Sequence, residues 1–164
     1  MSYIDRNLMD GEQIVYRGKL HLVIFIGPIV WFIIALAIFG VGVNMTEANV
    51  RMVMVAIAGI FTLSAIVTFI RPLIKYVTSE FGITNRRVIM KTGLFRRKSL
   101  EVLLNKIEGI QVNQSILGRL VGFGSITVTG TGGTKDPFHN IAAPFEFRKK
   151  AQEQIASVQN LENR

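Results

Sequence analysis

The chain has 164 residues, no cysteine and a formal net charge of +8. The lack of cysteine excludes disulfides and thiolate metal sites, so the fold depends on packing alone. Residues 71–164 hold 15 Lys and Arg against 7 Asp and Glu, a difference of +8, whereas residues 1–70 hold 4 of each. The C-terminal part therefore carries all of the net charge, which favours anionic lipid, nucleic acid or an acidic protein as a partner.

Two long apolar segments follow a short N-terminal segment, residues 1–19. Residues 20–43 and residues 52–70 contain no Asp, Glu, Lys or Arg. Each segment is long enough to cross a hydrocarbon core about 30 Å thick as a helix that rises about 1.5 Å per residue. We therefore predict a transmembrane hairpin over residues 20–70, with its loop at 44–51.

Two alternatives explain the apolar segments less well. Two buried helices of a soluble protein would need a larger surrounding core than residues 71–164 supply. Ala35-Leu36-Ala37 resembles the cleavage site of a signal peptide, but Asp5, Asp10 and Glu12 precede it and the apolar segment is too long for such a signal. Transport is also not expected, because no acidic, basic or histidine side chain lies within either predicted span, apart from His21 at the edge of the first.

The short loop requires the two helices to be antiparallel neighbours, so both chain ends lie on one side of the membrane. The loop carries only Arg51, whereas the side of the termini carries most of the basic residues near the spans: Arg6, Arg17, Lys19, Arg71, Lys75, Arg86 and Arg87. The positive-inside rule therefore predicts a multi-pass protein of the cytoplasmic membrane with both termini in the cytoplasm.

Beyond the second span, alternating apolar and polar residues predict β-strands. We expect these strands at residues 76–83, 87–91, 95–104, 107–112, 125–129 and 138–141. Thr84-Asn85 and Gly93 would form turns, and residues 115–120 one helical turn. Pro144 marks the start of a terminal helix with one apolar face, formed by Phe147, Ala151, Ile155 and Val158. Residues 71–164 are therefore expected to form an α+β domain.

Several motifs resemble those of the bacterial PH-like (pleckstrin-homology-like) membrane proteins. They are Glu12 with Tyr16-Arg17-Gly18, Ile83-Thr84-Asn85-Arg86-Arg87-Val88, Gly93, and Val112-x-Gln114-Ser115-x-Leu117-Gly118-Arg119-x-x-Gly122-x-Gly124. The last motif is the most specific, and the resemblance covers nearly the whole chain. It implies a transmembrane hairpin in the bacterial inner membrane, followed by one PH-like domain. That domain would have a roughly seven-stranded antiparallel sheet or barrel and a C-terminal helix.

No motif indicates catalysis, a cofactor or a metal. Residues 130–135 lack the residue order of a phosphate-binding loop. Asp136 and His139 lack the third converging group that an acid-base or zinc site needs. The basic residues are not accompanied by a recognition helix or an aromatic RNA-binding signature. We therefore expect no enzymatic activity, no cofactor and no nucleic-acid partner.

The basic residues fall into two groups if the strands form a simple meander. One group would lie near the membrane and contact anionic lipid headgroups: Arg71, Lys75, Arg96, Arg97 and Lys98. Arg86 and Arg87 would lie at the far end of the strands, against a protein partner or water. About eight residues at about 3.3 Å each separate the groups, several times the Debye length of about 8 Å, so they are not one site. Alternatively, the first group only fixes the membrane orientation.

Two functions are compatible with this organisation. In the first, the hairpin anchors a non-catalytic adaptor, which self-associates as a homo-oligomer or binds another membrane protein. A sheet edge or the groove beside the terminal helix would be the docking place. In the second, the membrane-proximal basic group senses or binds anionic lipid headgroups.

Overall fold

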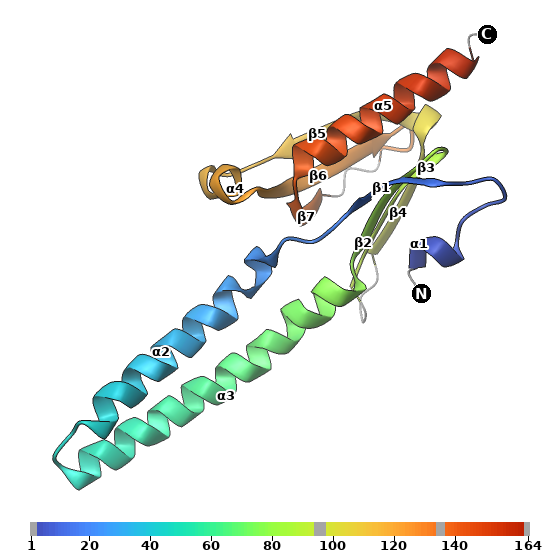
Figure 1. The fold of residues 1–164 in the computed structure, drawn as a ribbon. Helices are drawn as coiled ribbons and strands as arrows, with labels where there is room; N and C mark the ends of the chain where they lie inside the picture. Colours follow the sequence, from blue (N-terminus) through green and yellow to red (C-terminus); the bar gives the residue numbers. More distant parts are fainter. Residues whose placement is uncertain (1–2, 94–97, 134–136, 163–164) are drawn as a thin grey trace. The chain divides into compact units, whose positions relative to one another are not determined.

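The computed structural model describes residues 3–93, 98–133 and 137–162, and the chain divides into two compact units (Figure 1). The helical unit is Leu22–Lys75. The sheet unit combines Met1–His21 with Tyr76–Arg164. The segment before the first apolar helix, which we treated as separate from the C-terminal domain, therefore belongs to the same unit as that domain.

The helical unit contains the two predicted apolar helices. A 3-10 turn, η1 (Leu22–Phe25), leads into α2 (Ile26–Val43), and α3 (Ala48–Thr78) follows a short connection. The segments Leu22–Val43 and Ala48–Thr78 are long and apolar enough to cross a membrane. Length and composition are what support this assignment.

Small residues form the seam between α2 and α3. The buried residues recur at intervals of seven, which is the spacing of a left-handed helix pair, and they are Pro28, Ala35 and Gly42 on α2 with Ala58 and Ala65 on α3. The Trp31 and Phe61 rings lie 5.2 Å apart, and the Phe25 and Phe69 rings 5.0 Å apart. These pairs run in opposite chain directions, so the helices form the predicted antiparallel hairpin.

The predicted strand at 76–83 is wrong over its first half. Helix α3 continues through Pro72 to Thr78, and the strand begins only at Glu80. Proline removes one backbone hydrogen bond but does not end a helix that is supported on both sides. The predicted strand rested on Val77, Phe81 and Ile83 sharing one face, a pattern too short to distinguish strand from helix.

Seven strands of the described chain form two antiparallel sheets. The first sheet has the order β1-β2-β3-β4, and its strands are β1 (Ile14–Gly18), β2 (Glu80–Thr84), β3 (Arg87–Thr92) and β4 (Lys98–Leu103). The second sheet has the order β5-β6-β7, and its strands are β5 (Ile107–Asn113), β6 (Phe123–Gly130) and β7 (Pro137–Ala142). The number of strands agrees with the prediction, but β1 comes from the N-terminal segment and was not predicted.

The two sheets do not close into one barrel. In the chain, the 3-10 turn η2 (Leu104–Lys106) separates β4, the edge of the first sheet, from β5, the edge of the second. Beyond the C-terminal end of β1, an isolated bridge pairs Leu20 with Ile141 of β7. The described strands therefore form two sheets and not a continuous cylinder.

The core of the sheet unit lies between the sheets and helix α5 (Pro144–Glu162). Phe147 and Ala151 of α5 are fully buried, as predicted from their spacing, and helix α5 starts at Pro144 as expected. A Cβ on Gly18 would lie 3.0 Å from the Phe147 ring, so glycine lets β1 approach the helix. A short helix, α1 (Tyr3–Arg6), buries Ile4 against β2 at Gly82.

Candidate interaction surfaces

A buried ion pair joins the N-terminal segment to the turn between β2 and β3. The Arg87 guanidinium donates to both carboxylate oxygens of Glu12, at 2.9 and 3.0 Å. It also donates to Glu101 at 2.7 Å and to the carbonyl of Asn7 at 2.6 Å. The side chains of Arg87 and Glu12 are 9% and 0% exposed. The hydroxyl of Thr84 lies 2.7 Å from Glu12 and completes the network.

This network sets the charge state of both partners. Burial alone would raise the pKa of Glu12, but hydrogen bonds from Arg87, Met9 and Thr84, together with the charge of Arg87, hold that pKa below its ordinary value of 4.5. The hydrogen bond to Glu12 raises the pKa of Arg87 against the effect of burial. Both groups are therefore charged at neutral pH, and each compensates the other.

The two arginines predicted to meet a partner lie in different environments. Arg86 is exposed in the turn after β2, and it stays a predicted contact residue. Arg87 is buried and its guanidinium is occupied by Glu12, Glu101 and Asn7, so we correct its assignment to a residue that holds the fold together. The sequence shows two adjacent arginines and does not distinguish their roles, because the difference depends on Glu12, which is distant in the chain and pairs with Arg87.

The predicted lipid contacts lie on separate elements. Arg71 and Lys75 lie one turn apart on α3, whereas Lys98 begins β4 in the sheet unit. The ammonium of Lys98 lies 5.1 Å from the centre of the Phe138 ring. Arg96 and Arg97 lie outside the described residues. A lipid site formed by all five remains a prediction.

The most specific sequence motif builds a tight loop around the short helix α4 (Ile116–Val121). The hydroxyl of Ser115 caps α4 by accepting from the amide of Gly118 at 3.1 Å. The side-chain amide of Gln114 donates to the carbonyl of Phe123 at 2.9 Å. A Cβ on Gly118 would lie 2.5 Å from that same carbonyl, and Gly122 ends α4 with φ of 86°. Close packing and the left-handed backbone at Gly122 thus explain these glycines.

A groove runs between α5 and the edge strand β5. It encloses about 290 Å³ and is lined by Ile107, Glu108, Gly109 and Ile110 of β5 and by Gln152, Ile155, Ala156 and Gln159 of α5. Strand β5 is the edge of its sheet, so one row of its backbone groups has no strand partner in the described chain. The groove therefore combines apolar side chains with backbone hydrogen-bonding groups.

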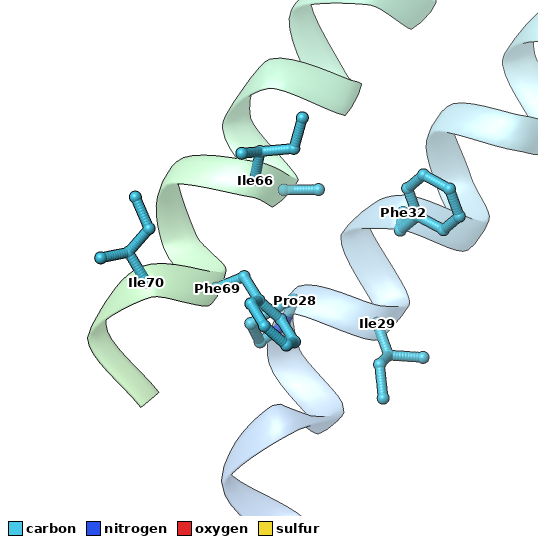
Figure 2. Close-up of a pocket in the computed structure, with 7 residues that line it drawn as sticks. Pro28, Ile29, Phe32, Ile66, Phe69 and Ile70 are labelled. Carbon is cyan, nitrogen blue, oxygen red and sulfur yellow. The ribbon is translucent and has the colours of Figure 1, made fainter. Parts of the chain in front are cut away.

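The hairpin contains a second cleft, of about 310 Å³, next to Pro28 (Figure 2). Its lining is entirely apolar, and Figure 2 shows Pro28 of α2 and Phe69 of α3 among the residues that line it. The other residues that line it are Ile29, Phe32, Ala65, Ile66 and Ile70. Because no ionisable side chain reaches this cleft, it offers apolar packing and no acid-base or ion-binding chemistry.

In the part of the chain that the structure describes, three or more His, Asp or Glu side chains that could hold a metal are not found together. His139 lies 2.9 Å from the hydroxyl of Ser125, and both are at the surface. Asp136, the other residue considered with His139, lies outside the described residues.

The order of elements, a hairpin of apolar helices followed by strands and a C-terminal helix, agrees with a comparison with known families. The family model described as Bacterial PH domain matches residues 22–159. The chain belongs to the bacterial PH domain family. The match confirms the resemblance found in the motifs, and it covers the hairpin together with β2 to β7 of the PH-like unit. No curated protein and no solved structure gave a match.

The buried pair of the PH-like unit is the main feature that the sequence did not reveal. Glu12 and Thr84-Asn85-Arg86-Arg87 are both parts of the family motifs, yet their spacing of about 75 residues gave no reason to pair them. The signal that was present is an acidic residue near an N-terminal Tyr-Arg-Gly segment, which alternates weakly as a strand. The structure explains these two motifs as one network.

Proposed function

We propose that the protein is a non-catalytic, membrane-anchored adaptor. The hairpin holds the PH-like unit at the cytoplasmic face of the bacterial inner membrane. The PH-like unit then binds a second copy of itself or another membrane protein. The observation that carries this proposal is the groove between β5 and α5, which offers an open strand edge beside apolar side chains. This combination is what an added strand or helix of a partner uses.

The surface of the hairpin supports the anchor. Large apolar side chains on α2 and α3 are exposed along the length of both helices, among them Ile33, Leu36, Ile60, Leu63 and Val67. In water such surfaces would aggregate, whereas in lipid they match the solvent.

Site-specific photo-crosslinking in native membranes tests the adaptor. A photoreactive residue is placed at Gln152 or Gln159, which line the groove, and at Ser157, which is exposed on the same helix but does not line it. We expect a reproducible product of defined mass from the two groove positions and none from Ser157. Monomer at all three positions would contradict the proposal.

Binding of anionic headgroups is the second candidate, and the charge difference of +8 over residues 71–164 favours it. The full chain is reconstituted with spin-labelled phosphatidylglycerol or phosphatidylcholine, and the fraction of immobilised lipid is measured. A headgroup site predicts an excess of phosphatidylglycerol that falls with added salt. It also predicts loss of the excess when Arg96, Arg97 and Lys98 become Glu, but not when Lys106, Lys149 and Lys150 do. Equal immobilisation of the two lipids would exclude this function.

A further inference from the structure

Helix α4 presents four large apolar side chains to solvent, an arrangement that the motif's tight packing does not explain. Their exposed fractions are 82% for Ile116, 67% for Leu117, 79% for Leu120 and 52% for Val121. Phe145, at the start of α5, is also half exposed. Exposed apolar patches of this kind mark contact sites with lipid or protein.

The packing of the loop around α4 directs these four side chains toward solvent. On its inner side Gly118 is buried, the hydroxyl of Ser115 caps α4, and the side-chain amide of Gln114 donates to the carbonyl of Phe123. Gly118 faces the same carbonyl, leaving no room for a side chain on the inner face. In Figure 1, α4 forms the tip that joins β5 to β6. The loop is therefore a rigid projection with an apolar outer surface.

This projection lies at the end of the sheet unit from which the chain enters its first apolar helix. The ring of His21 lies 5.5 Å from the ring of Phe123, two residues after α4 ends. Backbone hydrogen bonds hold the exit segment there, from His21 to Asn140 at 2.7 Å and from Ala142 to Lys19 at 2.9 Å. The candidate span begins at the next residue, Leu22. The chain therefore leaves the sheet unit for the span at the end where Phe123 follows α4.

The charges around α4 suit a lipid surface. Arg119 lies on α4 itself and is exposed, and the guanidinium of Arg148 lies 5.4 Å from the centre of the Phe145 ring. Lys19 is exposed in the exit segment. Residues 109–131 contain no Asp or Glu. Apolar side chains bordered by basic ones are typical of segments that lie in the interface of an anionic bilayer.

We propose that α4 inserts Ile116, Leu117, Leu120 and Val121 into the lipid interface beside the entry of the first span. The bilayer is then a contact surface for the PH-like unit as well as its anchor. This inference rests on the proposed membrane location. Headgroup binding would depend on the five predicted basic residues, whereas this insertion depends on apolar side chains of a different element, α4.

Depth-dependent fluorescence quenching tests the proposal in the full chain, which has no native cysteine. Single Cys substitutions at Leu120, Ser157 and Ile33 are labelled with nitrobenzoxadiazole and reconstituted in vesicles of phosphatidylethanolamine and phosphatidylglycerol. Quenching by lipids with a nitroxide on the acyl chain is then measured. We expect severalfold stronger quenching at Leu120 than at Ser157, and strong quenching at Ile33 in the hairpin.

Three results would overturn the proposal, each in a different way. Quenching at Ile33 with a water-like signal at Leu120 would leave the hairpin in the membrane and remove α4 from it. A blue-shifted label at Leu120 without lipid quenching would show that a protein covers α4. No quenching at Ile33 would refute the membrane location itself, and the insertion of α4 with it.

A second variant tests whether the apolar side chains themselves cause insertion. The label is placed at Ile116→Cys, and Leu117→Gln and Leu120→Gln are introduced together in the same chain. These two substitutions should abolish quenching, because they remove the apolar surface. Both side chains are exposed, so the thermal unfolding of the PH-like unit should not change. Quenching that persists in this variant would contradict the proposal.

Discussion

The guanidinium of Arg87 binds both carboxylate oxygens of Glu12, although 75 positions separate the two residues in the chain. The pair fastens the N-terminal segment onto the turn between β2 and β3. It thereby makes the residues before the first apolar helix part of the unit that follows the second. Four predictions follow from this relationship and from the hairpin.

Removing one partner of the buried pair should strongly destabilise the PH-like unit. Glu12→Ala leaves the charge of Arg87 buried without its main partner, which costs about 3–5 kcal/mol. The free energy of unfolding of the full chain in detergent, measured with denaturant, checks this value. Asp5→Ala is the matched control, because it breaks the exposed pair with Arg17 and should cost no more than about 1 kcal/mol. Equal losses of unfolding free energy in the two variants would show that the buried pair stabilises the protein no more than the exposed pair does.

Stability should fall on acidification because of Glu12. Its pKa is below 4.5 in the folded state and close to 4.5 when unfolded, so the unfolded state takes up the proton first. The stabilisation is therefore complete above the unfolded pKa and is lost as the pH falls through the folded pKa. Thermal unfolding of the wild type and of Glu12→Gln between about pH 7 and about pH 3 measures this difference. A wild-type curve that falls no more steeply than that of Glu12→Gln would contradict it.

The small residue at the loop end of the hairpin should be required for helix contact. A Cβ on Gly42 would lie 2.8 Å from the Cβ of Met54, so Gly42→Ala forces α2 and α3 apart at a cost of about 1–3 kcal/mol. Trp31 is the single tryptophan and lies in the helical unit, so its fluorescence reports the unfolding of that unit. Gly40→Ala is the control, because a Cβ there meets no neighbouring atom within 4 Å. Equal unfolding temperatures for Gly42→Ala and Gly40→Ala would contradict the close contact between α2 and α3 at Gly42.

The predicted orientation can be measured with single cysteines in the cysteine-free chain. Thr46→Cys, in the loop between the helices, should react with a membrane-impermeant maleimide added to spheroplasts. Ser157→Cys, on α5, should react only after the membrane is permeabilised, because the positive-inside rule places α5 in the cytoplasm. The reverse pattern of labelling would invert the topology.

Local patterns were sufficient for most elements of this protein. The two apolar segments are long and contain no Asp, Glu, Lys or Arg, which is typical of membrane-spanning helices, so they predicted the helices of the hairpin directly. Thr84-Asn85 and Pro144 act within a few residues of themselves, and they mark the turn between β2 and β3 and the start of α5 as predicted. The most specific motif is local in the same way, because Gln114, Ser115, Gly118 and Gly122 shape the loop around α4.

The tertiary structure decided what depends on residues distant in the chain. Strand β1 is short and weakly patterned, and it becomes a strand because β2 pairs with it and Phe147 packs on Gly18. Arg86 and Arg87 are equivalent in the sequence, and burial beside Glu12 gives only Arg87 a structural role. The apolar residues of α4 could equally have been core positions, until the fold placed them on the surface. Sequence periodicity reports which face of an element is apolar, whereas only packing determines what that face meets.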